Sequence, residues 1–360
     1  MLNFTVGPVM TDPAITMIAN SSTPYFRTSD FSAIMKDNEK LMLEFLNAPE
    51  ESKCVFLTSS GTGAMESCVM NILNEKDKVI IINGGSFGQR FVELCNIHRI
   101  GYTEVKCDFG NQVRSEQLEK LEDKGYTALL VNMDETSSGV LYNMEMISNF
   151  CKKKNLLLIV DAISAFLSDN LDMSALKADA VITSSQKALA VQPGISIIAL
   201  SSFALDRVRT NPEKGMYLSL KDALKNAERG QTPFTPAVTI LLQINYRLNR
   251  IKAAGGIGAE KQRIEAVAKK VRNRLHNYPF EFVIKSDKDR SNAVTAVRPL
   301  TCGAKKIVQC MKDDYQIWVC PNGGDMADRI FRIGHIGYIR DEDINCLFSA
   351  LDDMKKRKII

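Results

Sequence analysis

Short apolar runs separated by amphipathic stretches dominate residues 54–200 and predict alternating strands and helices. The apolar runs predict seven strands, at Cys54–Thr58, Val79–Ile82, Tyr102–Lys106, Ala128–Asn132, Leu156–Val160, Ala180–Thr183 and Ile195–Leu200. Nearly continuous apolar strands that alternate with helices are typical of a mostly parallel sheet with helices on both faces. We therefore expect an α/β fold for this part of the chain.

A second, smaller unit is predicted by the pattern after residue 254. A helix expected at Ala237–Ala253 is followed by Gly255-Gly256-Ile257-Gly258, which we interpret as a hinge. The remaining pattern predicts strands near Phe280–Ile284, Ala293–Pro299, Gln316–Val319 and Ile330–Ile333, with helices near Ala304–Met311 and Asp341–Met354. We expect a large domain over residues 16–254, a small C-terminal α/β domain over residues 255–360, and an N-terminal arm over residues 1–15 that joins the small domain.

Composition and charge narrow the class of protein. The 360 residues are 45% hydrophobic and 24% charged, with a net charge of +4, and the basic residues are scattered, which argues against a nucleic-acid or membrane-surface partner. The nine cysteines are odd in number and form no C-x-x-C pair, as expected for free thiols in a reducing cytosol. With no leader pattern and no apolar stretch of ~18 residues, we expect a cytoplasmic protein.

Polar clusters follow the predicted strands at the points where each strand ends. In a parallel sheet the ligand site lies at the carboxyl ends of the strands, so these clusters are expected to meet. The clusters are Ser59–Ala64, Gly84–Gly88, Asp134–Gly139, Asp161–Ser164 and Ser184–Lys187.

Lys187 lies between two predicted buried strands. Removal of an ammonium group from water lowers its pKa toward the range in which the neutral amine attacks a carbonyl, as in a Schiff-base lysine. The alternative is an ordinary lysine in a surface turn.

The sequence Ser60-Gly61-Thr62-Gly63 joins a strand to an expected helix. Glycines at the positive end of a helix expose backbone N–H groups, an arrangement that binds a phosphate. A simple tight turn is an equal alternative. Because the sequence has neither the lysine of a P-loop nor the spacing of a dinucleotide fingerprint, it argues against ATP and NAD.

Five further residues are chemically suggestive, and three of them have a plain alternative. Asp161 ends a fully apolar strand and needs a cation such as a protonated pyridine nitrogen, or it caps the next segment. Phe87 stacks on a flat ring or is part of the core. Arg332 binds a carboxylate ligand or pairs with an internal acid. Thr136 and Ser164 offer hydroxyl donors of low specificity.

Together these features resemble the class V, fold type I, pyridoxal-phosphate-dependent aminotransferases, closest to the alanine–glyoxylate, serine–pyruvate and 2-aminoethylphosphonate–pyruvate group. The resemblance covers nearly the whole chain. Its most specific part is Ser185-Gln186-Lys187-Ala188-Leu189 followed by Pro193-Gly194-Ile195-Ser196.

The resemblance implies a complete set of cofactor contacts. Lys187 would hold pyridoxal 5'-phosphate as an internal aldimine, and Asp161 would keep its ring nitrogen protonated. Phe87 would stack on the ring and Thr136 would bind its phenolic edge. The remaining implied cofactor contacts are Gly61, Thr62, Gly63, Ser164 and Gln186.

The resemblance also implies a homodimer whose sites are shared. Thr232 and Thr235 of the partner subunit would complete the phosphate site. Arg332 would bind the substrate carboxylate, with Gly7 and Arg27 as further substrate contacts. Relatives often carry tyrosine where Thr232 stands, and many carry histidine where Phe26 precedes Arg27.

The sequence therefore predicts a transaminase that moves an amino group from an alanine- or serine-type amino acid to a glyoxylate- or pyruvate-type 2-oxo acid. One alternative is a 2-aminoethylphosphonate–pyruvate transaminase. A cysteine desulfurase-like lyase is a weaker alternative, because those relatives place a histidine directly before the lysine and this chain has Gln186. A non-catalytic, cofactor-binding regulator is the alternative from another class.

Overall fold

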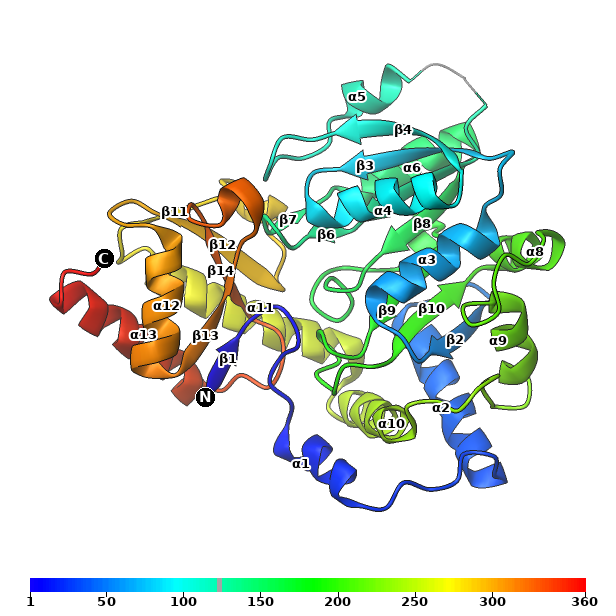
Figure 1. Ribbon diagram of the computed structural model, residues 1–360, viewed down its shortest axis with the longest axis horizontal. Helices are drawn as coiled ribbons and strands as arrows, with labels where there is room; N and C mark the ends of the chain where they lie inside the picture. Colours follow the sequence, from blue (N-terminus) through cyan, green and yellow to red (C-terminus); the bar gives the residue numbers. More distant parts are fainter. Residues whose placement is uncertain (122–124) are drawn as a thin grey trace.

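Two large sheets, each with its own helices, form most of the computed structural model, which describes residues 1–121 and 125–360 (Figure 1). The larger sheet has seven strands in the order β2-β10-β9-β8-β5-β3-β4. β10 pairs antiparallel with both β2 and β9, and the other neighbouring strands pair in parallel. The expected α/β fold with a mostly parallel sheet is confirmed. The strands are β2 (Lys53–Leu57), β3 (Lys78–Asn83), β4 (Gly101–Lys106), β5 (Ala128–Asn132), β8 (Leu157–Asp161), β9 (Ala180–Ser184) and β10 (Ser196–Leu200).

Successive residues of the central strands alternate between two cores, as a pleated strand buried on both faces requires. Ile80 and Ile82 pack into one core, and Val79 and Ile81 into the other. The first core is covered by α2 (Ser29–Phe45), α6 (Met144–Lys154), α7 (Met173–Leu176) and α10 (Val238–Ala253), and the second by α3 (Gly61–Ile72), α4 (Ser86–Ile97), α8 (Ser202–Thr210) and α9 (Leu220–Ala227).

A short hairpin follows β5 where the sequence pattern indicated only a polar cluster. It consists of β6 (Asp134–Glu135) and β7 (Val140–Leu141). The amides of Ser138 and Gly139 both donate to the carbonyl of Glu135, at 3.0 and 2.8 Å. Because Gly139 has φ +83°, a conformation that glycine adopts without strain, the chain reverses within this cluster.

The smaller sheet has five strands in the order β1-β13-β14-β12-β11, and both chain ends lie near it in Figure 1. The N-terminal strand β1 pairs in parallel with β13, so the first residues of the chain complete the C-terminal sheet. The elements are β1 (Leu2–Phe4), β11 (Phe280–Phe282), β12 (Val294–Pro299), β13 (Ile317–Pro321), β14 (Phe331–Gly334), α12 (Ala304–Tyr315) and α13 (Asp341–Lys356).

The helix α11 (Gly256–Leu275) connects the two parts of the molecule (Figure 1). Its Ile264 packs into the core of the large sheet, whereas Val271 and Leu275 pack against the small sheet. Gly255 and Gly256 have φ +106° and +73°, and their turn separates α10 from α11. The hinge and the domain boundary at residues 254–255 stay predictions.

The shorter elements are α1 (Pro13–Thr16), η1 (Met17–Asn20), α5 (Ser115–Glu119), η2 (Asp287–Asp289) and η3 (Gly324–Met326). In the described parts of the chain, no helix is both long and apolar enough to cross a membrane.

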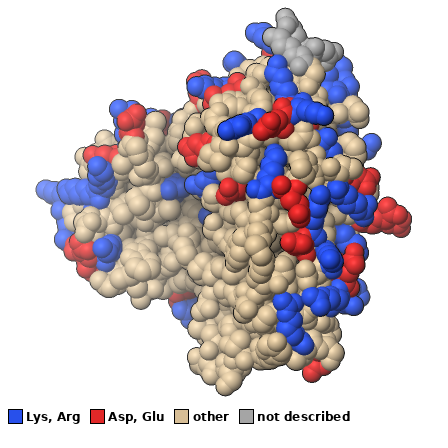
Figure 2. Space-filling view, turned by 45° about the vertical axis from the view of Figure 1, so that its right-hand side comes forward, with Lys and Arg blue, Asp and Glu red and all other residues tan. Residues whose placement is uncertain are grey.

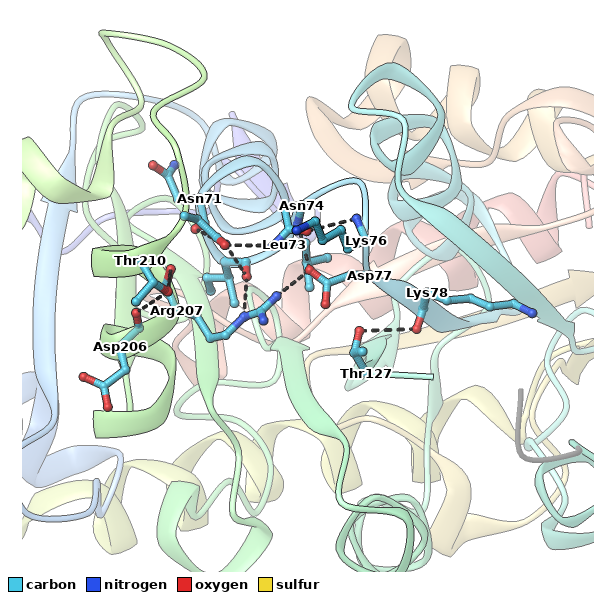
Figure 3. A network of polar contacts seen from close by, with 12 residues as sticks. Asn71, Leu73, Asn74, Lys76, Asp77, Lys78, Thr127, Asp206, Arg207 and Thr210 are labelled. Atoms are coloured by element: carbon cyan, nitrogen blue, oxygen red, sulfur yellow. Dashed lines mark hydrogen bonds and ion pairs between the residues drawn. The ribbon is translucent and has the colours of Figure 1, made fainter. Parts of the chain in front are cut away.

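A polar network closes the end of α3 that lies away from the carboxyl ends of the strands (Figure 3). Arg207 of α8 donates from Nε to the carbonyl of Ile72 at 3.1 Å and pairs with Asp77. Asn211 donates to the same Ile72 carbonyl at 2.8 Å. The free carbonyls at the C-terminus of α3 are therefore satisfied by side chains, which fixes the helix against the sheet.

Candidate active site

Lys187 lies in the turn between β9 and β10, at the edge of the sheet where the preceding parallel strands end. Its carbonyl accepts from Ala190 N at 2.8 Å, which closes the turn. The side chain is half-buried, and this removal from water lowers the pKa of its ammonium group below 10.5. The carboxylates of Asp134 and Asp161 partly oppose the shift, whereas the charge of Arg332 adds to it. A lysine in an ordinary surface turn would be exposed, whereas Lys187 is half-buried and has a lowered pKa.

The N-terminal arm crosses directly over Lys187. Gly7 has φ +134°, and a Cβ atom at this position would lie 2.7 Å from Lys187 Cδ. Val9 N donates to the carbonyl of Gln186 at 3.2 Å, which holds the arm against the turn. Only glycine fits this close approach, so the arm forms one wall around the amine.

Asp161 is the last residue of β8, one residue further than the predicted strand end. Its side chain is buried, and burial raises its pKa to about 6, with Lys187 among the charges that oppose the rise. Oδ1 accepts from Ile163 N at 2.9 Å, so Asp161 does cap the following segment. Among the described residues no hydrogen bond reaches Oδ2. This free oxygen leaves room for a cationic partner.

The first turn of α3 has the form expected of an anion site. Ser60 precedes the helix without a side-chain capping bond, and the first helical N–H groups have no acceptor within the helix. A Cβ atom on Gly61 would lie 2.4 Å from Ile163 Cδ1, and one on Gly63 would lie 2.8 Å from Ser59 Cβ. Both glycines are therefore required by packing, which leaves half-buried Thr62 as the side chain of this turn.

A buried hydroxyl lies next to this turn. Ser184, the last residue of β9, has an Oγ atom that finds no partner among the described residues. The same atom would lie 3.5 Å from a Cβ on Gly61. An unsatisfied buried hydroxyl is costly, so its position beside an anion-binding turn is informative.

Phe87, in the first turn of α4, is held in place by a residue that the sequence analysis did not single out. Buried Glu135 accepts from Phe87 N at 3.1 Å and from Gly88 N at 3.2 Å, and it also accepts from the Ser137 hydroxyl. A carboxylate at a helix N-terminus is favourable. The guanidinium of Arg90 lies 5.0 Å from the Phe87 ring centre. Glu135 lies in the dense polar cluster at 134–139, but its spacing gave no sign of this contact.

Arg332 extends from β14 without an acidic partner in the described residues. Nη1 donates to the carbonyl of Thr136 at 2.9 Å and Nη2 to that of Pro321 at 2.6 Å. Nε is buried and has no partner. The alternative of an internal Asp or Glu therefore finds no support. Thr136 itself is buried, and its contact with Arg332 is made by its backbone.

Ser164 lies close to the site, but its hydroxyl is already engaged. It donates to Asp134 Oδ1 at 2.5 Å. Its contact with a cofactor stays a prediction, as does that of half-buried Gln186, whose backbone carbonyl is taken by the N-terminal arm.

Arg27, Thr232 and Thr235 form a separate group within this chain. Arg27 donates to the carbonyls of Thr232 and Pro233 at 2.8 and 3.0 Å. The Thr232 hydroxyl donates to the carbonyl of Phe234 at 2.8 Å, and Thr235 is exposed. In the described parts of the chain, none of these side chains forms a hydrogen bond with Lys187 or the first turn of α3.

A cavity of about 1200 Å³ lies elsewhere, between α6, α7 and α11. Lys187, Asp161 and Arg332 are not among its lining residues. Some of its charged side chains are already paired, for example Lys269 with Glu265 and Arg290 with Asp287. The candidate active site is therefore the edge of the sheet at Lys187, where the charges of Asp161 and Arg332 act on the amine.

Known proteins are similar to this chain in sequence and in fold. A family model described as aminotransferase class-V matches residues 16–330. An uncharacterized aminotransferase of Methanocaldococcus jannaschii is 30% identical over 96% of this chain and 90% of its own length. An L-aspartate–glyoxylate aminotransferase of Paracoccus denitrificans is 29% identical over 80% of this chain and 74% of its own length. The solved structure of an alanine–glyoxylate aminotransferase from Nostoc sp. has a TM-score of 0.91 at 22% identity, covering 98% of this chain and 94% of that one, which is a likeness of fold.

Proposed function

The chain belongs to the class V aminotransferases, and from this premise we propose that it moves an amino group from a small amino acid to glyoxylate or pyruvate with pyridoxal phosphate held on Lys187. The family and the transaminase activity expected from the sequence are confirmed. The observation that carries the proposal is the meeting of Lys187, whose pKa is lowered, with Asp161 and Arg332. The Paracoccus relative, named as an aspartate–glyoxylate enzyme, supports glyoxylate as the acceptor.

The residues around Lys187 fit pyridoxal phosphate in charge and shape. The first turn of α3, with the unpartnered Ser184 hydroxyl beside it, suits the phosphate. Asp161, with one oxygen free, suits the protonated ring nitrogen, and Phe87 and Thr136 suit the ring face and its phenolic edge. When bound, the cofactor supplies an electron sink for the bonds at the amino acid's α-carbon.

Lys187 holds and moves the proton in this proposal. A lysine whose pKa is lowered by partial burial is more often neutral, so Nζ is able to accept the α-proton of the amino acid. The same nitrogen, Nζ, then gives this proton back to a different one of the reacting atoms. Gly7 leaves no side chain between the arm and Lys187, so the arm packs closely against this half-buried side chain.

Arg332 binds and orients the substrate carboxylate. Its two terminal nitrogens are fixed by the carbonyls of Thr136 and Pro321, and Nε remains to be satisfied. A cation without an acidic partner attracts the carboxylate of the amino acid and, in turn, that of the 2-oxo acid. Gly7 lies against Lys187, in keeping with a substrate contact.

A homodimer completes the proposal. Residues 13–26 contain no Lys, Arg, Asp or Glu, and Met17 and Tyr25 are strongly exposed there. The lowest lobe in Figure 2, where Figure 1 places α1 and η1, is mostly without charge. Such a surface favours contact with a second copy. Because Arg27 is bonded to the Thr232–Pro233 segment, we expect Arg27, Thr232 and Thr235 to face the partner's site as one unit.

The cysteines agree with a reducing compartment, and we propose a cytoplasmic location. All nine are free thiols. Burial raises the pKa of the Cys95 and Cys151 thiols to about 12, which makes these two unreactive.

A panel of amino donors and 2-oxo acceptors tests the proposed function. The purified chain, supplied with pyridoxal phosphate, is incubated with alanine, serine, aspartate, 2-aminoethylphosphonate or cysteine and with glyoxylate or pyruvate. We expect transfer from at least one of alanine and serine to glyoxylate or pyruvate. Transfer only from 2-aminoethylphosphonate, or release of sulfide from cysteine, would replace the proposed substrates. No turnover with any pair would favour the regulator.

A further inference from the structure

Two buried aspartates and one serine hydroxyl lie in contact next to the site. Their hydrogen bonds need more hydrogens than the serine hydroxyl provides. Asp134 lies on β6, Asp169 follows β8 and Ser291 precedes β12, and their residues are exposed by only 3%, 3% and 0%. Ser291 Oγ is 2.8 Å from Asp134 Oδ2 and 2.9 Å from Asp169 Oδ2. It also accepts from Ala293 N at 3.1 Å.

A count of hydrogens shows that one is lacking. A serine hydroxyl has a single hydrogen, so Ser291 donates to only one of the two carboxyl groups. One lone pair is used by Ala293 N, and the other faces the second carboxyl oxygen at hydrogen-bond distance. If both aspartates were ionised, two lone pairs would face each other at a buried contact. One extra proton on either carboxyl group turns the contact into a hydrogen bond.

The neighbouring hydroxyls do not supply that hydrogen. Ser164 donates to the other oxygen of Asp134. Ser168 lies 3.0 Å from Asp169 Oδ2, but its hydroxyl is nearer to the carbonyl of Ser164, at 2.7 Å. Even if Ser168 turned to Asp169, the contact between Asp169 and Ser291 would still lack a hydrogen.

We propose that Asp134 and Asp169 share one proton through the hydroxyl of Ser291, so that the pair carries one negative charge and acts as a positioning pair for Lys187. The pair ties the segment 291–293 of the small-sheet side to the end of the large sheet where Lys187 lies. Asn292 N donates to Asp169 Oδ1 at 2.9 Å, and Ser291 N donates to the carbonyl of Gly139 at 3.0 Å.

Burial and mutual repulsion agree with a retained proton. Burial raises the pKa of Asp134 to about 7, and the nearby charge of Asp169 adds to the rise. Burial also raises the pKa of Asp169. Two carboxyl groups that interact this closely lose their protons as a pair. The other charged groups that face them are Asp161 and Lys187 on the Asp134 side and Arg272 on the Asp169 side.

In this proposal the single negative charge lies on Asp134, the carboxyl group that acts on Lys187. The hydrogen count is satisfied with the proton on either carboxyl group. With the proton on Asp169, ionised Asp134 accepts from both Ser164 and Ser291 and faces the Lys187 ammonium. Among the charges that raise the pKa of Lys187, Asp134 has the largest effect, ahead of Asp161. The pair therefore offsets part of the pKa lowering that burial imposes on the amine.

Infrared spectroscopy of the full-length chain near neutral pH tests the shared proton. We expect a carbonyl band of a protonated carboxylic acid that disappears in Asp134→Asn and also in Asp169→Asn, because each amide supplies its own hydrogens to Ser291. Asp179→Asn is the matched control. Burial also raises the pKa of Asp179, but its partners Leu158 N and Ser201 Oγ are separate donors. A band that persists in both pair variants would overturn the proposal.

The pH dependence of unfolding gives a second readout. A carboxyl group whose pKa is higher in the folded state stabilises the fold below its unfolded pKa, and this stabilisation is lost as the pH rises toward the folded value. For the pair this window runs from 3.8 to about 7. Across this window the denaturant midpoint should fall less steeply in Asp134→Asn than in the wild type. Introduced into both of these chains, Asp179→Asn should leave the difference between their slopes in place. An unchanged slope in Asp134→Asn would contradict a shared proton.

The positioning role is tested by the pH profile of Lys187 labelling with an amine-reactive reagent in the cofactor-free chain. Asp134→Asn removes the charge that faces Lys187 and should shift the profile to lower pH. Asp169→Asn keeps that charge on Asp134 and should leave the profile near the wild type. Equal profiles in both variants would overturn the positioning role. Because none of these measurements uses amino transfer, the proposal stands or falls apart from the proposed substrates.

Discussion

Arg332 donates a hydrogen bond from Nη1 to the backbone carbonyl of Thr136, 2.9 Å away, and so connects the small sheet to the hairpin beside the large sheet. The guanidinium is thereby oriented before any substrate arrives. An arginine fixed by two carbonyls, with no acid to neutralise it among the described residues, keeps its charge for a ligand. The geometry of carboxylate binding therefore depends on how the two sheets sit together.

Replacing this arginine should weaken binding of both substrates. Arg332→Lys removes the planar fork and should cost about 1.5–3 kcal/mol of binding free energy for a charged hydrogen bond, or roughly 10- to 150-fold in KM. The effect should appear for the amino donor and the 2-oxo acceptor, because both carboxylates use the same arginine. Arg298→Lys, an exposed change on β12, is the control. A loss limited to one substrate would mean that Arg332 contacts a side chain instead.

Lys187→Ala should abolish turnover and leave the fold intact, since the side chain is only half-buried and its turn is closed by backbone bonds. In the wild type, borohydride should attach the cofactor covalently to Lys187, as peptide mapping would show. Lys40→Ala, an exposed change on α2, should retain full activity. Steady-state turnover by the Lys187→Ala variant would refute the role of this amine.

Asp161→Asn should lower kcat by several orders of magnitude, because a neutral amide cannot hold a ring nitrogen protonated. Asp161→Glu keeps the charge and should do less harm. The bond from Ile163 N to Oδ1 survives in the asparagine variant, so its thermal stability should stay close to that of the wild type. Wild-type rates in Asp161→Asn would show that Asp161 serves only as a cap.

Gly7→Ala tests the close approach of the arm to the amine. The new Cβ atom would lie 2.7 Å from Lys187 Cδ, and the backbone φ of +134° is strained for alanine. A displacement of the amine by about 1 Å can cost on the order of 100-fold in rate. Gly256→Ala shares a positive φ but has open space around it, so it isolates the effect of strain. Equal kcat values for the two variants would rule out a clash at Lys187.

Most strands of the large sheet were predictable because they are apolar runs, and polar clusters at their ends were expected to meet because parallel strands end at one edge. Asp161 and Lys187 were singled out in this way, whereas Arg332 was singled out as an arginine within an apolar strand of the small sheet. Glu135 was not, because nothing in the spacing of an acid and a later helix start indicates that the acid will bind Phe87 N. The two carboxyl contacts of Ser291 span 157 and 122 residues, and no local pattern predicts which distant polar side chains become partners.

The unit formed by Arg27 and the Thr232–Pro233 segment carries the last prediction, which concerns assembly. Within this chain these residues form no hydrogen bond, among the described residues, with the phosphate-binding turn of α3. If they act on the partner's cofactor, a monomer should bind pyridoxal phosphate poorly. Sedimentation at micromolar concentration should show a two-fold symmetric homodimer, more stable with cofactor than without it. Arg27→Ala should release the 231–233 segment and weaken cofactor affinity without changing Lys187. A fully active monomer would contradict the shared site and leave the transaminase assignment untouched.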